Sequence, residues 1–395
     1  MRICIIYDCL YPWTVGGAER WYRALAERLA AEGHQVTYLT RRQWERADPP
    51  LIAGVQVIAV TAGGSLYQNG RRRILPPIRF GAGVATHLLR HGQAYDVVHV
   101  ASFPYFSLLA VALMRRWRRY RVAVDWWEVW TASYWREYLG PIGGRVGWGI
   151  QRLCVRLQIP AFCFSALHAE RLRAEGHRAP LTTLRGAYTG RQTAIAPQPA
   201  QPLLLYAGRH IPEKRLTALI PAIVEARRTL PDLRLLLVGD GPARQSILDR
   251  VAAHGLQDVV DLPGFVDEST LARAMAQSLC LMLPSRREGY GMVVIEAAAY
   301  GTPSIVVRDP DNAATELIAE GVNGFIAGST SASDLASAIL RVHNAGYTLR
   351  ESTTRWFAEH VGRLALDASL ATVLQRYRGE EAAPNATSIV TNDDR

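Results

Sequence analysis

The sequence predicts an α/β protein with two similar domains, each built on a parallel β-sheet that helices cover on both faces. Its length of 395 residues exceeds what one hydrophobic core usually serves, and 49% of the residues are hydrophobic, enough for two cores. Short apolar runs of strand length alternate with amphipathic stretches of helix length, a pattern typical of parallel sheets with helical crossovers. The alternation stops at residues 191–202, which contain three prolines, and then starts again.

The strands are predicted from apolar or β-branched runs. In the first domain these runs cover residues 2–7, 35–40, 55–60, 96–100, 121–126 and 161–165. An amphipathic stretch over 17–33 that ends at Gly33 predicts a helix between the first two. In the second domain the runs cover residues 203–208, 233–241, 259–265, 279–285 and 303–307. The predicted architecture is therefore two Rossmann-like domains that face each other.

The domain boundaries follow from where this alternation occurs. We expect an N-terminal domain over residues 1–190, a linker over 191–202 and a C-terminal domain over 203–345. The segment 346–378 is predicted to be helical. The tail 379–395 is polar and weakly patterned, which is typical of disorder.

The composition favours a cytoplasmic protein. The longest apolar runs, such as residues 106–114, are much shorter than the roughly 18 residues of a membrane-spanning helix. The N-terminal residues do not resemble a signal peptide. Five cysteines, an odd number without C-x-x-C spacing, argue against a disulfide framework or a zinc site, and no D-x-D motif at a strand end suggests another metal. We therefore expect no metal.

Charge is divided unevenly between the two halves. Residues 1–200 contain 26 basic and 12 acidic residues, whereas residues 201–395 contain 19 basic and 23 acidic residues. The basic residues of the first half gather in three clusters, at residues 70–73, 115–121 and 145–158. A solvated arginine-rich surface and a real binding face both remain open.

If the basic half binds a partner, an anionic membrane surface is the favoured one. Trp117, Tyr120 and Trp148 lie among the arginines, and aromatic groups beside basic groups suit a lipid headgroup layer. Nucleic acid is not expected as a partner, because no known nucleic-acid-binding motif accompanies the charge.

Open parallel sheets bind ligands at the carboxyl ends of their strands, and four regions at such positions contain unusual residues. In the first, Gly16 and Gly17 let the backbone approach a ligand, and the next helix directs its first amides there. The second carries Arg209 and Lys214, and Lys214 is the only lysine in the chain. Two cations at a strand end can hold a diphosphate. A solvated lysine is the alternative, although arginine fills every other basic position.

The third region combines Gly239 and Gly241 with the later pair Phe265 and Val266. Both parts follow apolar strands and offer glycines with open backbone amides, which suit a bound ligand. Phe265 is either an ordinary residue at the core edge or a contact near a nucleobase. The sequence leaves both interpretations open.

The fourth region begins at Glu288, continues through a glycine-flanked turn over 289–291 and enters a predicted helix that ends before Gly301. Glu296 is the only charged residue of that helix, and a buried carboxylate needs donors. The diol of a ribose would supply two hydroxyl donors. For both Glu288 and Glu296, a helix-capping or salt-bridged glutamate is the alternative.

These motifs together resemble the family 4 glycosyltransferases, which are retaining enzymes of the GT-B architecture. The stretches GGAER, GR…EK, VGDGP, PGFV and EGYGMVVIE, the last with two glutamates separated by seven residues, occur in the family's order over most of the chain. The resemblance implies an acceptor domain over 1–190 and a nucleotide-sugar donor domain over 203–345. It also implies that helices within 346–378 return to the N-terminal domain, and that no cofactor is needed.

The resemblance further implies roles for individual residues. Arg209 and Lys214 would hold the donor diphosphate, with Lys214 placed where negative charge builds on the leaving group. Glu288 would bind hydroxyls of the donor sugar, Glu296 the ribose and Val266 the base. The sugar hydroxyls and phosphates would also meet the backbone amides of Gly289, Tyr290, Gly291, Met292 and Val293.

One departure from the family concerns the N-terminal domain. Members often carry a histidine followed by Asp or Glu after the strand that here covers 121–126, where this chain has Trp126, Trp127 and Glu128. Asp125 or Glu128 takes over the polar role, or the donor sugar differs, or activity is reduced. His99 is a further polar candidate, with a satisfied strand histidine as the alternative.

Aromatic residues gather around this departure. They are Trp126, Trp127, Trp130, Tyr134 and Trp135. Such a cluster is either core packing or a platform for an acceptor, because aromatic faces suit sugars and lipid stems.

The predicted function is transfer of a sugar from a UDP- or GDP-linked donor to a glycan or lipid-linked acceptor at the cytoplasmic membrane face, as in polysaccharide biosynthesis. The implied mechanism retains the anomeric configuration, and the leaving phosphate helps to deprotonate the acceptor hydroxyl. Two alternatives stay open. One is another GT-B enzyme, such as an epimerase or a sucrose-type synthase, and the other is a non-catalytic sugar-nucleotide-binding partner protein.

Overall fold

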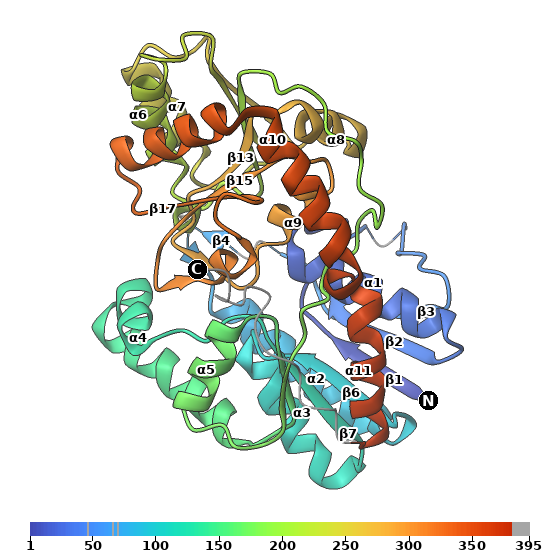
Figure 1. Ribbon diagram of the computed structural model, residues 1–395. Coiled ribbons are helices and arrows are strands. Elements are labelled where there is room, and N and C mark those ends of the chain that lie inside the picture. The colour runs from blue at the N-terminus through green and yellow to red at the C-terminus, as the bar shows by residue number, and fades with distance from the viewer. Residues whose placement is uncertain (46, 65–66, 69–70, 381–395) are drawn as a thin grey trace. The chain divides into compact units, whose positions relative to one another are not determined.

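The computed structural model describes residues 1–45, 47–64, 67–68 and 71–380 (Figure 1). Two compact units make up this part of the chain. The first contains Met1–Thr189 together with the segment that begins at Leu366, and the second contains Gly190–Ala365. Residues 381–395 of the tail that the sequence predicts to be disordered lie outside the described residues.

The first unit is built on a seven-stranded parallel sheet with the order β3-β2-β1-β6-β7-β8-β9. Its strands are β1 (Arg2–Ile6), β2 (Gln35–Arg41), β3 (Val55–Thr61), β6 (Val97–Ala101), β7 (Arg121–Trp126), β8 (Ala161–Cys163) and β9 (Leu181–Thr183). A short antiparallel pair consists of β4 (Tyr67–Gln68) and β5 (Arg71–Arg72). The helices are α1 (Gly17–Ala31), α2 (Leu75–His91), α3 (Tyr105–Arg118), α4 (Ala132–Arg156) and α5 (Ala166–Ala174), with a 3₁₀ turn η1 (Gly92–Ala94).

The central strands of this sheet explain its composition. All five residues of β6 and four of the five residues of β1 are buried. A strand covered by helices on both faces has no solvent side, and its sequence is therefore continuously apolar instead of alternating. The core formed by these strands also takes side chains from α2 and α3, such as Phe80 and Val111.

The second unit is built on a six-stranded parallel sheet with the order β12-β11-β10-β13-β15-β17. Its strands are β10 (Leu203–Ala207), β11 (Arg234–Val238), β12 (Val260–Gly264), β13 (Cys280–Leu283), β15 (Ser304–Val307) and β17 (Gly324–Ala327). The short strands β14 (Arg287–Glu288) and β16 (Asp311–Asn312) form a separate parallel pair. The helices are α6 (Leu219–Ala226), α7 (Arg244–Ala253), α8 (Glu268–Gln277), α9 (Met292–Ala298) and α10 (Ala332–Leu364), with the 3₁₀ turns η2 (Pro212–Lys214), η3 (Leu216–Ala218) and η4 (Ala313–Leu317).

The C-terminal helices divide between the two units. Helix α10 has a kink at Gly346, where φ is +57°, and belongs to the second unit. Helix α11 (Leu366–Arg378) belongs to the first unit, where it packs against α1 and β7. The predicted fold class, with two Rossmann-like parallel-sheet domains and a C-terminal helix that returns to the N-terminal one, is therefore confirmed.

Helix length and hydropathy bear on membrane insertion. None of the described helices combines enough length with enough apolar character to cross a bilayer. All five cysteines are buried as thiols within the described part of the chain.

Each sheet contains one point at which the strand order reverses. In the first unit it lies between β1 and β6, and in the second it lies between β10 and β13. Connections leave these neighbouring strands toward opposite faces of the sheet, which leaves room for a ligand between the two loops. The loops after β10 and β13 are thus where the second unit should bind a small molecule.

Candidate active site

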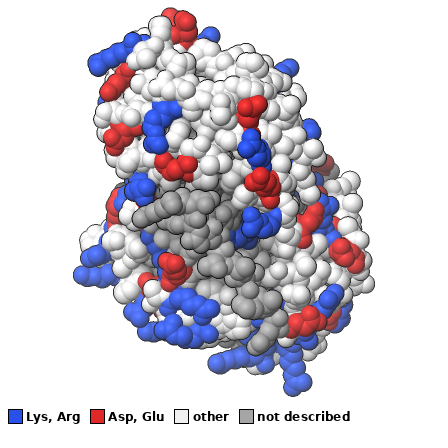
Figure 2. Space-filling model, in the orientation of Figure 1, with Lys and Arg blue, Asp and Glu red and all other residues white. Residues whose placement is uncertain are grey.

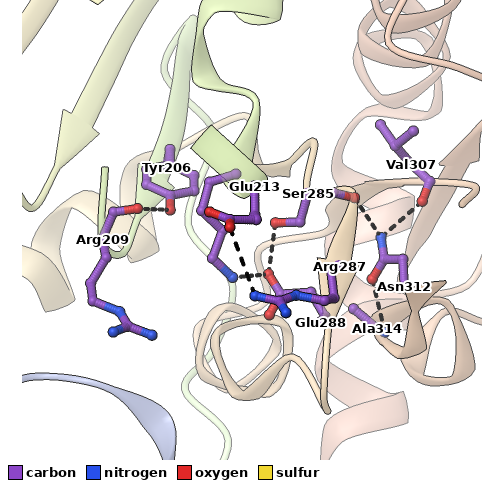
Figure 3. A network of polar contacts seen from close by, with 10 residues as sticks. Tyr206, Arg209, Glu213, Ser285, Arg287, Glu288, Val307, Asn312 and Ala314 are labelled. Carbon is purple, nitrogen blue, oxygen red and sulfur yellow. Dashed lines mark hydrogen bonds and ion pairs between the residues drawn. The ribbon is translucent and has the colours of Figure 1, made fainter. Parts of the chain in front are cut away.

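Lys214 and Glu288 meet across the reversal point of the second sheet. Lys214 ends η2 on the loop after β10, and Glu288 ends β14 on the loop after β13. The Lys214 Nζ donates to Glu288 Oε1 at 2.5 Å, and the Ser285 hydroxyl donates to the same oxygen at 2.7 Å (Figure 3). The two side chains of the pair are only 16% and 13% exposed. The single lysine of the chain therefore neutralises a largely buried carboxylate.

Backbone and side-chain contacts also hold these loops in place. The Arg286 amide donates to the Glu213 carbonyl at 2.9 Å, and Arg287 Nη2 lies 4.0 Å from Glu213 Oε1. Asn312, on β16, donates from Nδ2 to the carbonyls of Ser285 at 3.2 Å and Val307 at 2.8 Å. These contacts fix the positions of Lys214 and Glu288 before any ligand binds.

Arg209 lies near the start of the loop that also carries Lys214. Its carbonyl accepts a 2.9 Å hydrogen bond from the Tyr206 hydroxyl (Figure 3). Burial raises the pKa of Tyr206 well above its usual range, and the charge of Glu288 adds to the shift. The hydroxyl therefore stays protonated as a donor.

Gly239 and Gly241 let the loop after β11 pack tightly against the loop after β10. Their φ angles are +117° and +156°. A Cβ atom at Gly239 would overlap the carbonyl oxygen of Gly208, and one at Gly241 would overlap the carbonyl oxygen of His210. The His210 amide donates to the Asp240 carbonyl at 2.9 Å. These glycines thus have a packing reason that is independent of any ligand.

We expect Gly239→Ala to lower the free energy of unfolding by about 2–3 kcal/mol, because it combines a left-handed backbone with a clash that only movement of the Arg209 loop relieves. Gly255→Ala is the matched control, since Gly255 has a φ of +63° and open space around its Cβ position. That control should lose only about 1 kcal/mol. Urea unfolding of both variants measures the difference, and equal losses would contradict the packing argument.

The two predicted base contacts lie in different surroundings. Val266 lines a cavity of about 480 Å³ together with residues of β11, β12 and α8. Phe265 is 61% exposed, which excludes the interpretation of this residue as part of the core edge. An exposed ring of this size at a strand end is available to contact a ligand.

The turn after Glu288 leads directly into α9. Gly291 precedes the helix with a φ of +101°, and a Cβ atom there would lie 2.7 Å from the Ala314 Cβ. Tyr290 and Met292 are buried, whereas Gly289 and Val293 are partly exposed. Glu296 is, like Val293, only partly buried, on a helix whose other residues are buried.

The space beside the first glycine of the pair Gly16 and Gly17 is occupied by a side chain of the helix that follows. Gly16 is extended and immediately precedes α1, and a Cβ atom there would overlap the carboxylate of Glu19. Glu19 is buried at the start of the helix. This close approach explains the glycine at position 16, while Gly17 is the first residue of α1.

Asp125 lies in the buried interior of the first unit. Its Oδ1 is 2.7 Å from His99 Nε2, its Oδ2 accepts from Trp21 Nε1 at 3.1 Å, and His99 Nδ1 is 2.5 Å from the Tyr377 hydroxyl of α11. All four side chains are buried. Burial and the charge of Asp125 raise the pKa of Tyr377 well above its usual range, so its hydroxyl can donate to Nδ1 while Nε2–H donates to Asp125. Asp125 therefore makes structural contacts with two other elements of the first unit.

The aromatic cluster separates into buried and partly exposed residues, and Glu128 contacts one of the partly exposed ones. Trp126, Tyr134 and Trp135 are buried, which supports the core-packing interpretation for them. Trp127 is partly exposed and stacks on Phe164 with centroids 3.6 Å apart. Glu128 accepts a 2.8 Å hydrogen bond from the partly exposed Trp130. A platform role is thus restricted to the two partly exposed tryptophans.

Some residues of the site carry no sequence signal. Asn312 lies far from Glu288 in the chain, and only the pairing of β14 with β16 brings it to the loop. Ser285 has a weak signal, because it lies two residues after the apolar strand β13. No group of three or more His, Cys, Asp or Glu residues that could hold a metal occurs in the described ranges.

Two protein-family models match the chain. The model described as Glycosyltransferase Family 4 matches residues 15–158, and the one described as Glycosyl transferases group 1 matches residues 192–356. Alpha-D-kanosaminyltransferase of Streptomyces kanamyceticus is 31% identical over 142 residues, and this match covers 36% of each chain. Glycogen synthase of Mycobacterium tuberculosis is 26% identical over 362 residues, which covers 87% of this chain and 86% of that one.

Solved structures share the fold. Sucrose-phosphate synthase from Thermosynechococcus elongatus superimposes with a TM-score of 0.78 at 21% identity, covering 96% of this chain and 98% of that one. HepE from Anabaena in complex with UDP and glucose gives a TM-score of 0.73 at 17% identity, covering 96% and 99%. The two units and the returning helix thus define a GT-B glycosyltransferase fold. Within that class, the chain belongs to the family 4 glycosyltransferases.

Proposed function

We propose that this chain is a retaining glycosyltransferase that takes its sugar from a nucleotide diphosphate sugar, with UDP or GDP as the nucleotide. The observation that carries the proposal is the Lys214–Glu288 pair at the reversal point of the second sheet. A cation and a carboxylate held together in a largely buried place, on loops that face a ligand position, suit the two ends of a sugar diphosphate. The UDP in the complex of HepE, which shares the fold, supports the same donor class.

The pair would exchange its internal contact for contacts with the donor. The Lys214 ammonium would turn to the diphosphate, and the Glu288 carboxylate would accept hydrogen bonds from the sugar hydroxyls. The bond from the anomeric carbon to the phosphate oxygen breaks, and the acceptor oxygen bonds to the anomeric carbon on the same face. The hydroxyl proton of the acceptor goes to the leaving phosphate, whose growing charge Lys214 stabilises. Glu296 and Val266 would hold the ribose and the base.

A thermal-shift panel tests the donor site. A nucleotide at about 100 times its dissociation constant should stabilise the folded protein by roughly 2.7 kcal/mol, a visible rise in melting temperature. We expect UDP or GDP, and their sugar conjugates, to give this rise. If no UDP, GDP, ADP or TDP species shifts the melting temperature, the donor site is wrongly assigned. Binding without hydrolysis or transfer of any nucleotide sugar would instead indicate a non-catalytic partner protein.

We also propose that the acceptor is reached at an anionic membrane face through the ends of α2 and α3. This arginine–tryptophan patch consists of Leu89, Arg90, Leu113, Arg116, Trp117 and Arg119, all exposed. Trp117 is 59% exposed, and Arg118 contacts the Leu89 carbonyl, which joins the two helix ends. Basic side chains project over the part of the first unit that contains α3 (Figure 2). Exposed apolar groups within a basic surface suit a lipid headgroup layer.

The structure corrects two residues of the predicted membrane surface. Tyr120 is buried and donates its hydroxyl to the Val111 carbonyl at 2.8 Å. Trp148 is partly buried and donates to Glu175 at 3.2 Å, with the Arg152 guanidinium 4.9 Å from its ring. Only Trp117 presents its ring to the outside among the three aromatic residues that the sequence singles out.

Sedimentation with lipid vesicles tests this patch. The protein should bind vesicles that contain phosphatidylglycerol, and binding should weaken with added salt, because exposed charges are screened beyond about 10 Å at 0.1 M. Trp117→Ala should reduce binding several-fold, whereas Leu51→Ala, which removes another exposed apolar side chain of the first unit, should not. Equal binding to neutral vesicles, or none to either kind, would remove the membrane proposal.

A further inference from the structure

Two tryptophans form an exposed aromatic pair at the carboxyl edge of the first sheet. Trp13 lies on the loop after β1, and Trp44 follows β2, the strand next to β1. Their ring centroids are 5.8 Å apart, with the planes inclined at 58°. Trp13 is 39% exposed and Trp44 is partly exposed. Large aromatic rings are usually covered, so a paired and open arrangement at a ligand-binding edge needs an explanation.

The loops that carry the pair are held by a polar network centred on Gln43. Its Oε1 accepts from the Leu10 amide at 3.3 Å and from the Thr14 hydroxyl. Its Nε2 donates to the Thr40 hydroxyl at 3.3 Å and to the Arg41 carbonyl at 3.2 Å. One side chain thus links the loop around Trp13 to the end of β2, just before Trp44. A ring mounted on such a bonded loop loses little freedom when a ligand binds.

Further contacts stiffen the loop after β1 on its other side. Arg23 on α1 donates to the Tyr11 carbonyl at 3.1 Å, and its guanidinium lies 5.8 Å from the Tyr11 ring. The buried Arg41 donates to the Asp8 carbonyl at 3.1 Å. The strand β1 itself flanks the reversal point of this sheet, where a ligand of the first unit is expected.

The chemistry around the pair favours a sugar ring over a lipid chain. A pyranose has an apolar face of C–H groups, which suits an aromatic face, and a rim of hydroxyls, which needs polar neighbours. Trp44 directly precedes the exposed Glu45 and lies two residues after Arg42, so charged groups that can meet hydroxyls flank the ring in the chain. A site for an acyl chain would be apolar around its rim as well. The arginine–tryptophan patch differs from both kinds of site, because arginines that suit anionic lipid headgroups surround its apolar groups.

We propose that Trp13 and Trp44 form an acceptor subsite that stacks a sugar ring, so that the acceptor is a saccharide. This inference rests on the proposed function, which supplies the need for an acceptor, and it names residues that the family motifs do not include. Trp13, as the more exposed ring, is expected to contribute the larger share of the contact.

Saturation-transfer NMR and titration with maltotriose, cellotriose and chitotriose, in the presence and absence of UDP, test the subsite. At least one trisaccharide should bind the wild-type protein. Trp13→Ala should weaken that binding about tenfold, Trp44→Ala should weaken it less, and Trp13→Phe should retain most of it. Tyr347→Ala removes another exposed aromatic ring, in the second unit, and should leave binding unchanged.

The outcomes separate this proposal from that of the donor site. The UDP-induced melting shift and the hydrolysis of nucleotide sugar by water depend on the second unit, and should be the same in Trp13→Ala and in the wild-type protein. The subsite is wrong if no trisaccharide binds the wild-type protein, or if Trp13→Ala and Trp44→Ala both bind like it. Failure of the UDP shift with intact, Trp13-dependent trisaccharide binding would overturn the donor site alone.

Discussion

Lys214→Arg is expected to keep most of its affinity for the nucleotide donor while its turnover falls about a hundredfold. The positive charge remains, so the diphosphate is still attracted. The ammonium of Lys214, however, fits as a compact group 2.5 Å from Glu288 Oε1 in a pair that is 16% and 13% exposed. A guanidinium is longer and planar and places its donors elsewhere. Steady-state kinetics with a donor identified by the thermal-shift panel measure the effect, and an unchanged kcat would show that any cation serves at this position.

Three companion variants sharpen this experiment. Lys214→Ala should lose both affinity and turnover, because it also leaves Glu288 without its cation in a largely buried place. Glu296→Ala should mainly weaken nucleotide binding. Arg215→Lys is the matched control, since Arg215 neighbours Lys214 on the same loop and pairs with Asp309 at 2.6 Å. It should retain wild-type turnover.

Asp125→Ala is expected to lower the free energy of unfolding by about 3 kcal/mol or more, since it leaves the His99 and Trp21 ring N–H groups buried without an acceptor. For a unit of this size that corresponds to a fall of about 6–12 °C in melting temperature. Chemical and thermal unfolding followed by circular dichroism measure the loss.

Asp96→Ala serves as the control for this substitution. Asp96 forms an exposed ion pair with Arg2 at 2.7 Å, and such pairs contribute less than about 1 kcal/mol. If Asp125→Ala unfolds like the wild-type protein yet loses transfer activity, Asp125 belongs to the catalytic machinery after all, as the sequence suggested.

The sequence predicts most of the fold because buried parallel strands are continuously apolar. The run over 2–7, for example, becomes β1, and the run over 279–285 contains β13. The strands β9 and β17 are not predicted. Both lie at the ends of their sheets, where a strand has one neighbour and can be three or four residues long. Length alone does not decide this, because β8 is equally short and is predicted. Strand β9 contains two threonines and β17 begins with a glycine, so neither stands out as an apolar run.

The candidate site is predictable where chemistry is local and unpredictable where it depends on distant partners. Lys214 stands out as the only lysine, and the glutamate spacing marks Glu288. That the two form an ion pair supported by Asn312 follows only from the fold. The burial of Asp125 was equally hidden, because its partners His99 and Trp21 come from other elements of the first unit.

Helix α11 is the last described segment to be synthesised, yet it belongs to the unit whose other residues are synthesised first. A ribosome that adds about 5–20 residues per second needs about 10–35 s to make residues 190–365. During that interval the first unit lacks α11, so His99 has no Tyr377 hydroxyl beside it and α1 lacks the helix that packs against it. Translation that stops before Leu366 therefore yields a whole second unit and an incomplete first one. Truncation at the 3′ end of the messenger RNA would therefore disturb the N-terminal unit of the protein.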